Sequence, residues 1–472
     1  MPVRVERPVP SAGTGPAPPT VTGRGRRLHR STAPSGIPES PTTKDVMVYT
    51  PIPLAPHLPD RLTLTLWDFT WYTRTGPGEP FENLDRAFAE AVDRGYNTIR
   101  ICAMPFLTFR SGLSGEMEFG PLGGEYGQGT RWYDVRHITR LDPKAHLLAL
   151  LRAAQRHGVF VILSSWEYQQ SSSFAGDHQW FDSLMAVQPE DRPARLADAL
   201  ADCCELAEAE GLADVIAFVE LHNEVQGGYL TEGLPGREPA VVELRGRLEA
   251  GLARFHERRP HIPVTVNYAR VPLESFRGIP ENIDVGVFHP YVYGVLDELV
   301  TGYGLRSTDG GFDEERARAD LLRPGAPSFD QWRPPAGQEW RQRATIVGKP
   351  EIYVHDWVDE QAWDRLLYER YGAHRLAMHN TLDTWMAAAA DLCAARGVPL
   401  VFGEGWIGYT PLRGTFEEGP VGADFCRYAV RRSAEIGARG TIVCSNAAPH
   451  HPMWNDVELQ RECNALFARQ PV

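Results

Sequence analysis

Two short apolar runs that each lead to a carboxylate constrain the fold of this chain more than any other feature. Residues 216–221 lead to Asn223-Glu224, and residues 398–402 lead to Gly403-Glu404. Continuous apolar runs bounded by turn residues are typical of strands buried on both faces, and such strands belong to parallel sheets covered by helices. Carboxylates just beyond these strands would lie on the face of a (β/α)8 barrel where active sites form.

The rest of the chain alternates between strand patterns and helix patterns. Strands are expected at 62–68, 97–102, 159–163, 214–221, 263–267, 284–289, 398–404 and 440–446. Helices are expected at 81–94, 143–157, 193–210, 238–258, 360–396, 420–437 and 456–469. This order predicts an α/β fold, a (β/α)8 TIM barrel of eight βα units, each with a helix long enough for a right-handed crossover. Segments 105–135 and 295–357 interrupt the alternation, and we expect them as long loop insertions on the catalytic face.

Composition divides the chain into a tail and a barrel domain. Residues 1–45 are rich in proline, glycine and arginine and poor in large apolar residues, so we expect a disordered tail. Residues 46–472 would form the catalytic domain, for which an apolar fraction of 43% supplies an ample core. The net charge of −13 argues against nucleic acid as a partner, because such binding needs a basic field.

Other sequence features bear on the compartment and on partners. No apolar stretch approaches the roughly 20 residues that span a membrane, so no membrane association is expected. The N-terminus lacks the apolar region of a secretory signal. The seven cysteines are scattered without CxxC spacing, which argues against a disulfide framework or a zinc knuckle. These features predict a cytoplasmic protein, and they leave its oligomeric state open.

Glu224 and Glu404 have the chemistry needed to hydrolyse a glycosidic bond. Such reactions use two carboxyl groups that face each other across the bond. In a barrel, groups that follow different strands converge at one mouth, whatever their separation in sequence. Two like charges at close range disfavour joint ionisation, so the pair would keep the proton that acid catalysis requires. The structural alternative is that Glu224 caps the next helix and Glu404 forms an ion pair.

Aromatic and polar side chains follow other predicted strands at the same end of the barrel. Sugars have apolar C–H faces and polar edges, so a sugar site combines flat aromatic rings with carboxylates and amides. Trp67 and Asp68 follow the first strand, and Trp166 and Glu167 follow the third. All four are candidate sugar contacts, although each alone is also compatible with core packing. His222 can point either to the pocket or to a neighbouring strand.

The chain resembles the cellulase-like glycoside hydrolases of clan A, of which family 5 is the familiar case, over residues 60–465. The nearest likeness is to the sugar-binding cellulase-like proteins. In this clan an Asn-Glu pair ends strand four, matched by Asn223-Glu224, and a glutamate ends strand seven, matched by Glu404. The resemblance implies Glu224 as acid/base and Glu404 as nucleophile. It also implies that Asn223 donates to the sugar hydroxyl beside the anomeric carbon.

Further matches lie on strands two and six. The family tends to carry an arginine on strand two, matched by Arg100, and a His-x-Tyr at strand six, matched by His289 and Tyr291. Arg100 would keep Glu404 ionised and aligned. Tyr291 would hydrogen-bond the nucleophile, and His289 would contact the sugar or tune the acid. For each of the two ring residues, packing at the barrel rim is the alternative.

Two tryptophans complete the candidate sugar contacts. Trp406 follows the second carboxylate directly. Trp454 corresponds to the aromatic residue that often floors the sugar site after strand eight. The preceding segment, 447–452, departs from the usual pattern of the family.

These observations predict a retaining glycoside hydrolase that cleaves a β-linked glycoside or a short oligosaccharide through a covalent glycosyl-enzyme intermediate. The two insertions would wall a pocket rather than an open cleft, and a carbohydrate is the expected partner. A non-catalytic sugar-binding protein and a transglycosidase are the alternatives. We expect no cofactor and no metal. The closest candidate ligand pairs, His450-His451 and His355-Asp356, are adjacent residues that rarely reach one ion from an extended chain.

Overall fold

A parallel sheet of nine strand segments forms the centre of the computed structural model, which describes residues 49–307 and 310–469. The segments are β1 (Leu62–Asp68), β2 (Thr98–Cys102), β5 (Phe160–Ser164), β6 (Ile216–Glu220), β7 (Val264–Thr265), β8 (Asn267–Ala269), β9 (Gly286–His289), β10 (Leu400–Phe402) and β11 (Gly440–Ile442). Their order in the sheet is β7-β6-β5-β2-β1-β11-β10-β9-β8, and every pairing is parallel. Their apolar side chains are almost all buried, as expected of strands with helices outside and a packed interior.

The sheet closes on itself through a single stretch of chain. Its two outermost segments, β7 and β8, are consecutive in sequence and separated only by Val266. Val264 pairs with Val219 of β6, and Tyr268 pairs with Phe288 of β9. The predicted strand 263–267 is therefore divided in two. The closure confirms the predicted (β/α)8 TIM barrel.

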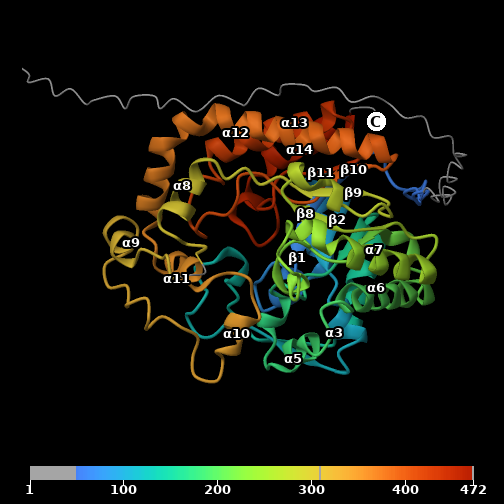
Figure 1. Cartoon of the computed structure of the whole chain (residues 1–472), viewed down its shortest axis with the longest axis horizontal. Helices are drawn as coiled ribbons and strands as arrows, with labels where there is room; N and C mark the ends of the chain where they lie inside the picture. The colour runs from blue at the N-terminus through green and yellow to red at the C-terminus, as the bar shows by residue number, and fades with distance from the viewer. Residues whose placement is uncertain (1–48, 308–309, 470–472) are drawn as a thin grey trace, which may run out of the picture. The chain divides into compact units, whose positions relative to one another are not determined.

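The helices that cover the barrel agree closely with the predicted ranges. They are α2 (Leu84–Asp93), α4 (Pro143–His157), α6 (Arg192–Ala209), α7 (Ala240–Arg258), α12 (Glu360–Arg396), α13 (Pro420–Glu435) and α14 (Val457–Arg469). Capping explains the agreement at α4, where Asp142 accepts a hydrogen bond from the amide of Ala145 at 2.8 Å and Gly158 ends the helix at φ 65°. Figure 1 shows α12, α13 and α14 packed side by side, and α6 against α7.

The prediction of a long helix in every βα unit is wrong for the fifth unit. Only a 3-10 segment, η5 (Leu273–Gly278), lies between β8 and β9. Pro272 precedes this segment and Pro280 follows it. Because proline lacks an amide donor and disfavours helical geometry in the residue before it, the two prolines leave no room for a longer helix.

The two predicted insertions carry short elements of their own. The first holds α3 (Pro105–Phe109), β3 (Met117–Phe119) and η1 (Arg131–Tyr133), and β3 pairs antiparallel with β4 (Thr139–Leu141). The second holds α8 (Val295–Gly302), α9 (Glu314–Asp320), α10 (Trp340–Arg343) and α11 (Lys349–Trp357). The remaining short helices are α1 (Thr70–Thr73), η2 (Ser171–Phe174), α5 (Gln179–Met185), η3 (Ala213–Val215), η4 (Gly228–Thr231) and η6 (Pro452–Asn455).

The predicted tail, residues 1–45, lies outside the described residues. Among the helices that are described, none combines the length and the apolar character needed to cross a membrane. All seven cysteines are free and buried.

Asp284, just before β9, ties the first described residues to the barrel wall. Its fully buried carboxylate accepts hydrogen bonds from the Tyr49 hydroxyl at 2.6 Å, the Ile52 amide at 2.7 Å and the Val264 amide at 2.8 Å. The ring nitrogen Nε2 of His256 lies 2.8 Å from the same carboxylate. One carboxylate therefore accepts hydrogen bonds from two backbone amides and a hydroxyl, and it also contacts a histidine ring.

We expect Asp284→Ala to lower the free energy of unfolding by about 3 kcal/mol or more, because several buried donors would lose their acceptor together. Chemical denaturation followed by tryptophan fluorescence measures the change. Asp60→Ala is the matched control, since that side chain is 98% exposed and lies 3.7 Å from Arg439. The control should shift stability by less than about 1 kcal/mol, and equal losses in the two variants would contradict the assignment.

Candidate active site

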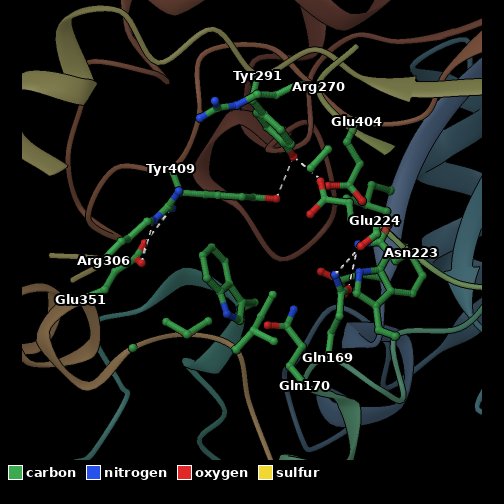
Figure 2. Close-up of a pocket in the computed structure, with 18 of the residues that line it drawn as sticks. Gln169, Gln170, Asn223, Glu224, Arg270, Tyr291, Arg306, Glu351, Glu404 and Tyr409 are labelled. Atoms are coloured by element: carbon green, nitrogen blue, oxygen red, sulfur yellow. Dashed lines mark hydrogen bonds and ion pairs between the residues drawn. The ribbon is translucent and has the colours of Figure 1, made fainter. Parts of the chain in front are cut away.

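A cavity of about 580 Å³ opens at the carboxyl ends of the barrel strands. Its volume lies within the range of small-molecule sites, roughly 300–1,000 Å³. Figure 2 shows Glu224 and Glu404 close together on one side of it. The lining combines aromatic and polar side chains, which include Trp132, Trp166, Gln169, Asn223, Tyr291 and Tyr409. The cavity thus brings together the two carboxylates that end the two apolar runs.

Glu404 is held by a cation and a hydroxyl. Arg100 on β2 donates from one guanidinium nitrogen to Glu404 Oε1 at 2.7 Å. The hydroxyl of Tyr291 donates to Glu404 Oε2 at 2.8 Å and lies 2.5 Å from the hydroxyl of Ser445. The Glu404 side chain is only 6% exposed. These contacts fix the orientation of the carboxylate.

Arg100 also binds two groups on the opposite side of its guanidinium. It forms a salt bridge with Glu220, the last residue of β6, at 2.7 Å, and both side chains are fully buried. It also donates to the side-chain oxygen of Asn223 at 2.7 Å. Glu220 in turn accepts from the side-chain amide of Asn267 on β8 at 2.8 Å. Burial alone would lower the pKa of Arg100, but the adjacent carboxylates raise it, so this side chain remains charged.

The loop after β6 places Glu224 in a strained conformation. The amide of Asn223 donates to the carbonyl of Ser165 at 2.7 Å, and the amide of Glu224 donates to the side-chain oxygen of Asn267 at 2.6 Å. Between these two anchors Glu224 adopts φ 43°, a region that side chains other than glycine rarely occupy. Neighbouring strands on both sides therefore hold Glu224 in a position that the loop alone would not favour.

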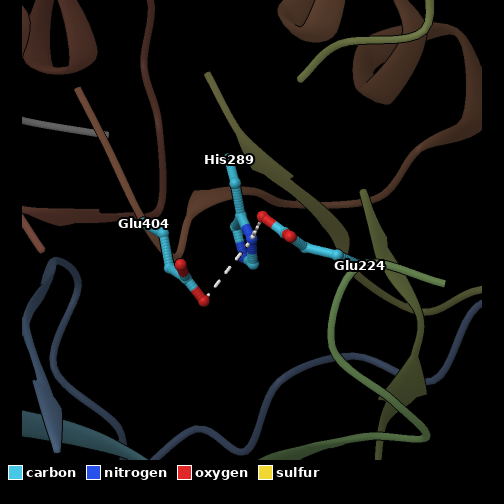
Figure 3. A group of neighbouring side chains, drawn as sticks. All are labelled: Glu224, His289 and Glu404. Atoms are coloured by element: carbon cyan, nitrogen blue, oxygen red, sulfur yellow. Dashed lines mark hydrogen bonds and ion pairs between the residues drawn. The ribbon is translucent and has the colours of Figure 1, made fainter. Parts of the chain in front are cut away.

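His289 lies between the two carboxylates, as Figure 3 shows. Its Nδ1 is 3.2 Å from Glu224 Oε1 and 3.6 Å from Glu404 Oε1. Glu224, His289 and Glu404 each present one atom within 4.8 Å of the others. Burial lowers the pKa of His289 to about 4 and raises the pKa of Glu224 to about 7. Near neutral pH a neutral imidazole therefore faces a carboxyl group that is still partly protonated.

The same three side chains have a spacing that a metal ion could use. Arg100, however, already donates to Glu404 Oε1, and a guanidinium at this position competes with a cation for the carboxylate. The candidate ligand pair His450-His451 makes contacts within the protein. A ring nitrogen of His450 lies 3.0 Å from the hydroxyl of Thr70, and the ring of His451 packs against that of His450 with centroids 4.0 Å apart. The contacts at Glu224 and Glu404 fit proton handling better than metal binding.

Both insertions contribute walls to the cavity. The first provides Trp132, and the second provides Arg306, Ile346 and Glu351. Asp356, at the end of the second insertion, accepts from the amides of Gly127 and Gly129 at 2.7 and 2.6 Å and from the indole of Trp332 at 2.9 Å. A side chain at Gly129 would collide with the backbone of residue 355. The two walls are therefore bound closely to each other.

Six of the predicted contact residues lie at the cavity or directly beside its carboxylates. Asp68, Trp166, Asn223 and Tyr291 line the cavity. Arg100 and His289 lie behind the lining and contact the two glutamates. Burial raises the pKa of Asp68 to about 7, so this carboxyl group can donate as well as accept hydrogen bonds near neutral pH.

The other five predicted contact residues are directed elsewhere. Trp67 packs on Phe81 and Phe88 with ring centroids 5.0 and 4.7 Å away. The Glu167 carboxylate accepts from the amides of residues 106 and 107, and His222 accepts from the amide of residue 168. Trp406 donates to the carbonyl of residue 443. Trp454 stacks on Tyr96 and donates to Glu90. None of these five lines the cavity, and their packing accounts for their positions.

Sequence reasoning missed several residues of the site. Glu220 could have been noticed, because a carboxylate inside an apolar strand requires a buried partner. Gln169 accepts from the side-chain amide of Asn223 at 3.1 Å, and Tyr409 lies 2.9 Å from the Tyr291 hydroxyl. Arg270 and Arg306 also line the cavity. The last four lie in loops, where residue spacing carries no structural signal.

One solved structure supports the fold, and two others show weaker likeness. A crystal structure of a protein from Parabacteroides distasonis, described as a candidate glycoside hydrolase, superposes with a TM-score of 0.60 at 19% identity, covering 88% of this chain and 95% of that one. An endo-β-1,4-mannanase from Thermotoga petrophila gives a TM-score of 0.45 at 13% identity, covering 88% and 78%. A glycoside hydrolase family 5 enzyme from Prevotella bryantii gives 0.44 at 12% identity, covering 88% and 99%.

No curated protein is a significant match to the sequence. A family model described as sugar-binding cellulase-like, in contrast, matches residues 64–467. This range runs from β1 to α14 and includes every residue of the candidate site named above. The chain therefore belongs to the family of sugar-binding cellulase-like proteins.

Proposed function

We propose that this protein is a retaining glycoside hydrolase that acts on a β-linked glycoside or a short oligosaccharide. The observation that carries the proposal is the approach of Glu224 and Glu404 to within 4.8 Å at the cavity. Carboxyl groups about 5–5.5 Å apart are typical of the retaining mechanism, whereas inverting enzymes leave roughly 6.5–9.5 Å for a water molecule. Membership of a cellulase-like family supports the β-linkage.

In the first step, Glu404 would attack the anomeric carbon while Glu224 gives its proton to the leaving oxygen. The glycosidic C–O bond breaks and an ester forms between the sugar and Glu404. In the second step, Glu224 takes a proton from water, which attacks the same carbon and releases Glu404. Arg100 and Tyr291 would stabilise the departing carboxylate through the bonds they already make to it.

The substrate is expected to be small. Both insertions line the cavity, whose volume is about 580 Å³, and Figure 2 shows Arg306 and Glu351 of the second insertion across it from the two carboxylates. A long polysaccharide would need an open path on both sides of the cleaved bond. Cuts in the middle of long β-glucan chains would therefore contradict this part of the proposal.

Activated 2-deoxy-2-fluoroglycosides test the nucleophile directly. The electronegative fluorine slows both steps, while a good leaving group lets the first proceed, so a covalent intermediate accumulates. Incubation with glucosyl, mannosyl and galactosyl reagents should add the mass of one fluorosugar to the intact protein. Peptide mapping should place the adduct on Glu404.

Two variants serve as controls for this labelling. Glu404→Gln should prevent it, whereas Glu125→Gln, an exposed glutamate of the first insertion, should not. An adduct on another residue, or a product of inverted anomeric configuration, would refute the assignment. Sugar binding without labelling or turnover would favour a binding protein, and products formed with added acceptors would favour a transglycosidase.

The pH dependence of the rate tests Glu224 as the acid. Because burial raises its pKa to about 7, the protonated form that catalysis needs is lost as the pH rises through that value. For substrates with poor leaving groups, kcat/KM should fall about tenfold per unit above about pH 7. Glu224→Gln should lower kcat/KM by about 10²–10⁴ and remove this alkaline limb. An unchanged limb in the variant would show that another group is the acid.

A further inference from the structure

Arg270 is a cation in the cavity wall that lacks an anionic partner. It follows β8 directly, and its side chain lines the cavity. Its exposed guanidinium makes no hydrogen bond or ion pair with a described residue, and it lies over the ring of Tyr293, 5.6 Å from the guanidinium carbon to the ring centroid. No described carboxylate lies within 4.0 Å of it. The five hydrogen-bond donors of this guanidinium are therefore free to bind a ligand.

Arg306, the neighbouring cation in the lining, is already occupied. It forms two parallel hydrogen bonds with Glu351, both at 3.0 Å, and donates to the Tyr293 hydroxyl at 2.8 Å. Its charge is thus balanced within the protein, and it holds Tyr293 in place beneath Arg270. Figure 2 shows the Arg270 side chain directed toward the part of the cavity where Arg306 lies, and away from Glu404. Arg270 is therefore a solvent-exposed cation on this side of the cavity, and no described carboxylate is paired with it.

The backbone at Arg270 is held rigidly in an unusual conformation. Its φ is 75°, in the left-handed region that residues other than glycine seldom adopt. The amide of Arg270 donates to the carbonyl of His289 at 2.8 Å, and the preceding carbonyl, of Ala269, accepts from the side chain of Gln226 at 2.7 Å. Strain that the surrounding structure maintains is typical of functional positions. The guanidinium is therefore presented from a fixed base.

Arg270 lies on the side of the cavity that the leaving group would occupy. The amide of Val225 donates to the carbonyl of Asn267 on β8 at 3.1 Å, and the side chain of Gln226 donates to Ala269, so the strand that ends at Arg270 lies beside the loop that carries Glu224. Glu224 is the proposed proton donor to the leaving oxygen, so groups beside it face the departing part of the substrate. Glu404, on the sugar side, has its own cation in Arg100.

We propose that Arg270 selects substrates whose leaving group carries a carboxylate, such as a sugar acid. This inference rests on the proposed function. A guanidinium binds a carboxylate through two parallel hydrogen bonds. A single free guanidinium balances a single negative charge. A phosphate monoester carries nearly two charges and would need a second cation, which Arg306 cannot supply while paired with Glu351. The structure therefore favours a carboxylate over a phosphate.

Two disaccharide derivatives of nearly the same shape test this specificity. Cellobionate has a carboxylate where cellobiitol has an alcohol, at the end of the residue that would form the leaving group. Corresponding pairs with mannose or galactose as the first sugar extend the test to other sugars. Affinities are measured by calorimetry in the Glu404→Gln background, which prevents turnover, and a third derivative with phosphate in place of the carboxylate forms a separate arm.

In at least one of these pairs we expect the acid to bind about tenfold more tightly than the alcohol, as for a charged hydrogen-bonded pair. Adding Arg270→Gln to the Glu404→Gln protein should reduce this ratio to about two or less. Added salt should reduce the ratio in the parent, the Glu404→Gln protein that keeps Arg270. Arg343→Gln is the matched control, because Arg343 also lies over an aromatic ring, that of Phe181, but outside the cavity lining. This variant should keep the preference of the parent.

Equal binding of acid and alcohol in every pair, failure of the parent to bind any of the acids, or a preference that persists in Arg270→Gln would overturn the proposal. Tighter binding of the phosphate arm than of the carboxylate would also overturn it. The result is separable from the proposed activity. Hydrolysis of neutral glycosides without acid preference refutes only the role of Arg270, whereas acid binding that depends on Arg270 without any turnover refutes only the glycosidase.

Discussion

The buried guanidinium of Arg100 is the interaction on which the rest of the site depends. It joins Glu220 on β6, Asn223 in the next loop and Glu404 after β10, and so connects strands that lie apart in the barrel. A buried charge without a partner is strongly destabilising, by about 3–5 kcal/mol when one member of a pair is removed. Here the single cation compensates two buried carboxylates, Glu220 and Glu404. The contacts that stabilise these buried charges in the barrel interior therefore also fix the positions of the Glu220 and Glu404 carboxylates.

The two carboxyl groups differ in their surroundings. Glu404 has a cation on one oxygen and a hydroxyl on the other. Glu224 faces a neutral His289 instead, and burial raises its pKa. Under the proposed mechanism, these surroundings suit Glu404 to act as nucleophile and Glu224 as acid, without any change in residue type. The arrangement follows from which strand each glutamate ends.

The sequence allowed the barrel and the two glutamates to be predicted, because buried apolar strands and their terminal turns have strong local signatures. Where two adjacent residues were predicted as sugar contacts, only one of each pair lines the cavity, because neighbouring residues at a strand end point to opposite sides. Asp68 faces the cavity, whereas Trp67 packs beneath the helices. Asn223 and His222 divide in the same way. Contacts from loops, such as Arg270, depend on tertiary packing that no local pattern encodes.

The joint between the two insertions has a consequence for the history of the family. Because the Asp356 carboxylate is shared between the amides of Gly127 and Gly129 and the indole of Trp332, neither wall is complete by itself. A relative that shortened one of them would leave unsatisfied polar groups and a bare surface on the other. The lengths of these two segments should therefore vary together among relatives, as a paired module that bounds the cavity while the barrel beneath stays unchanged.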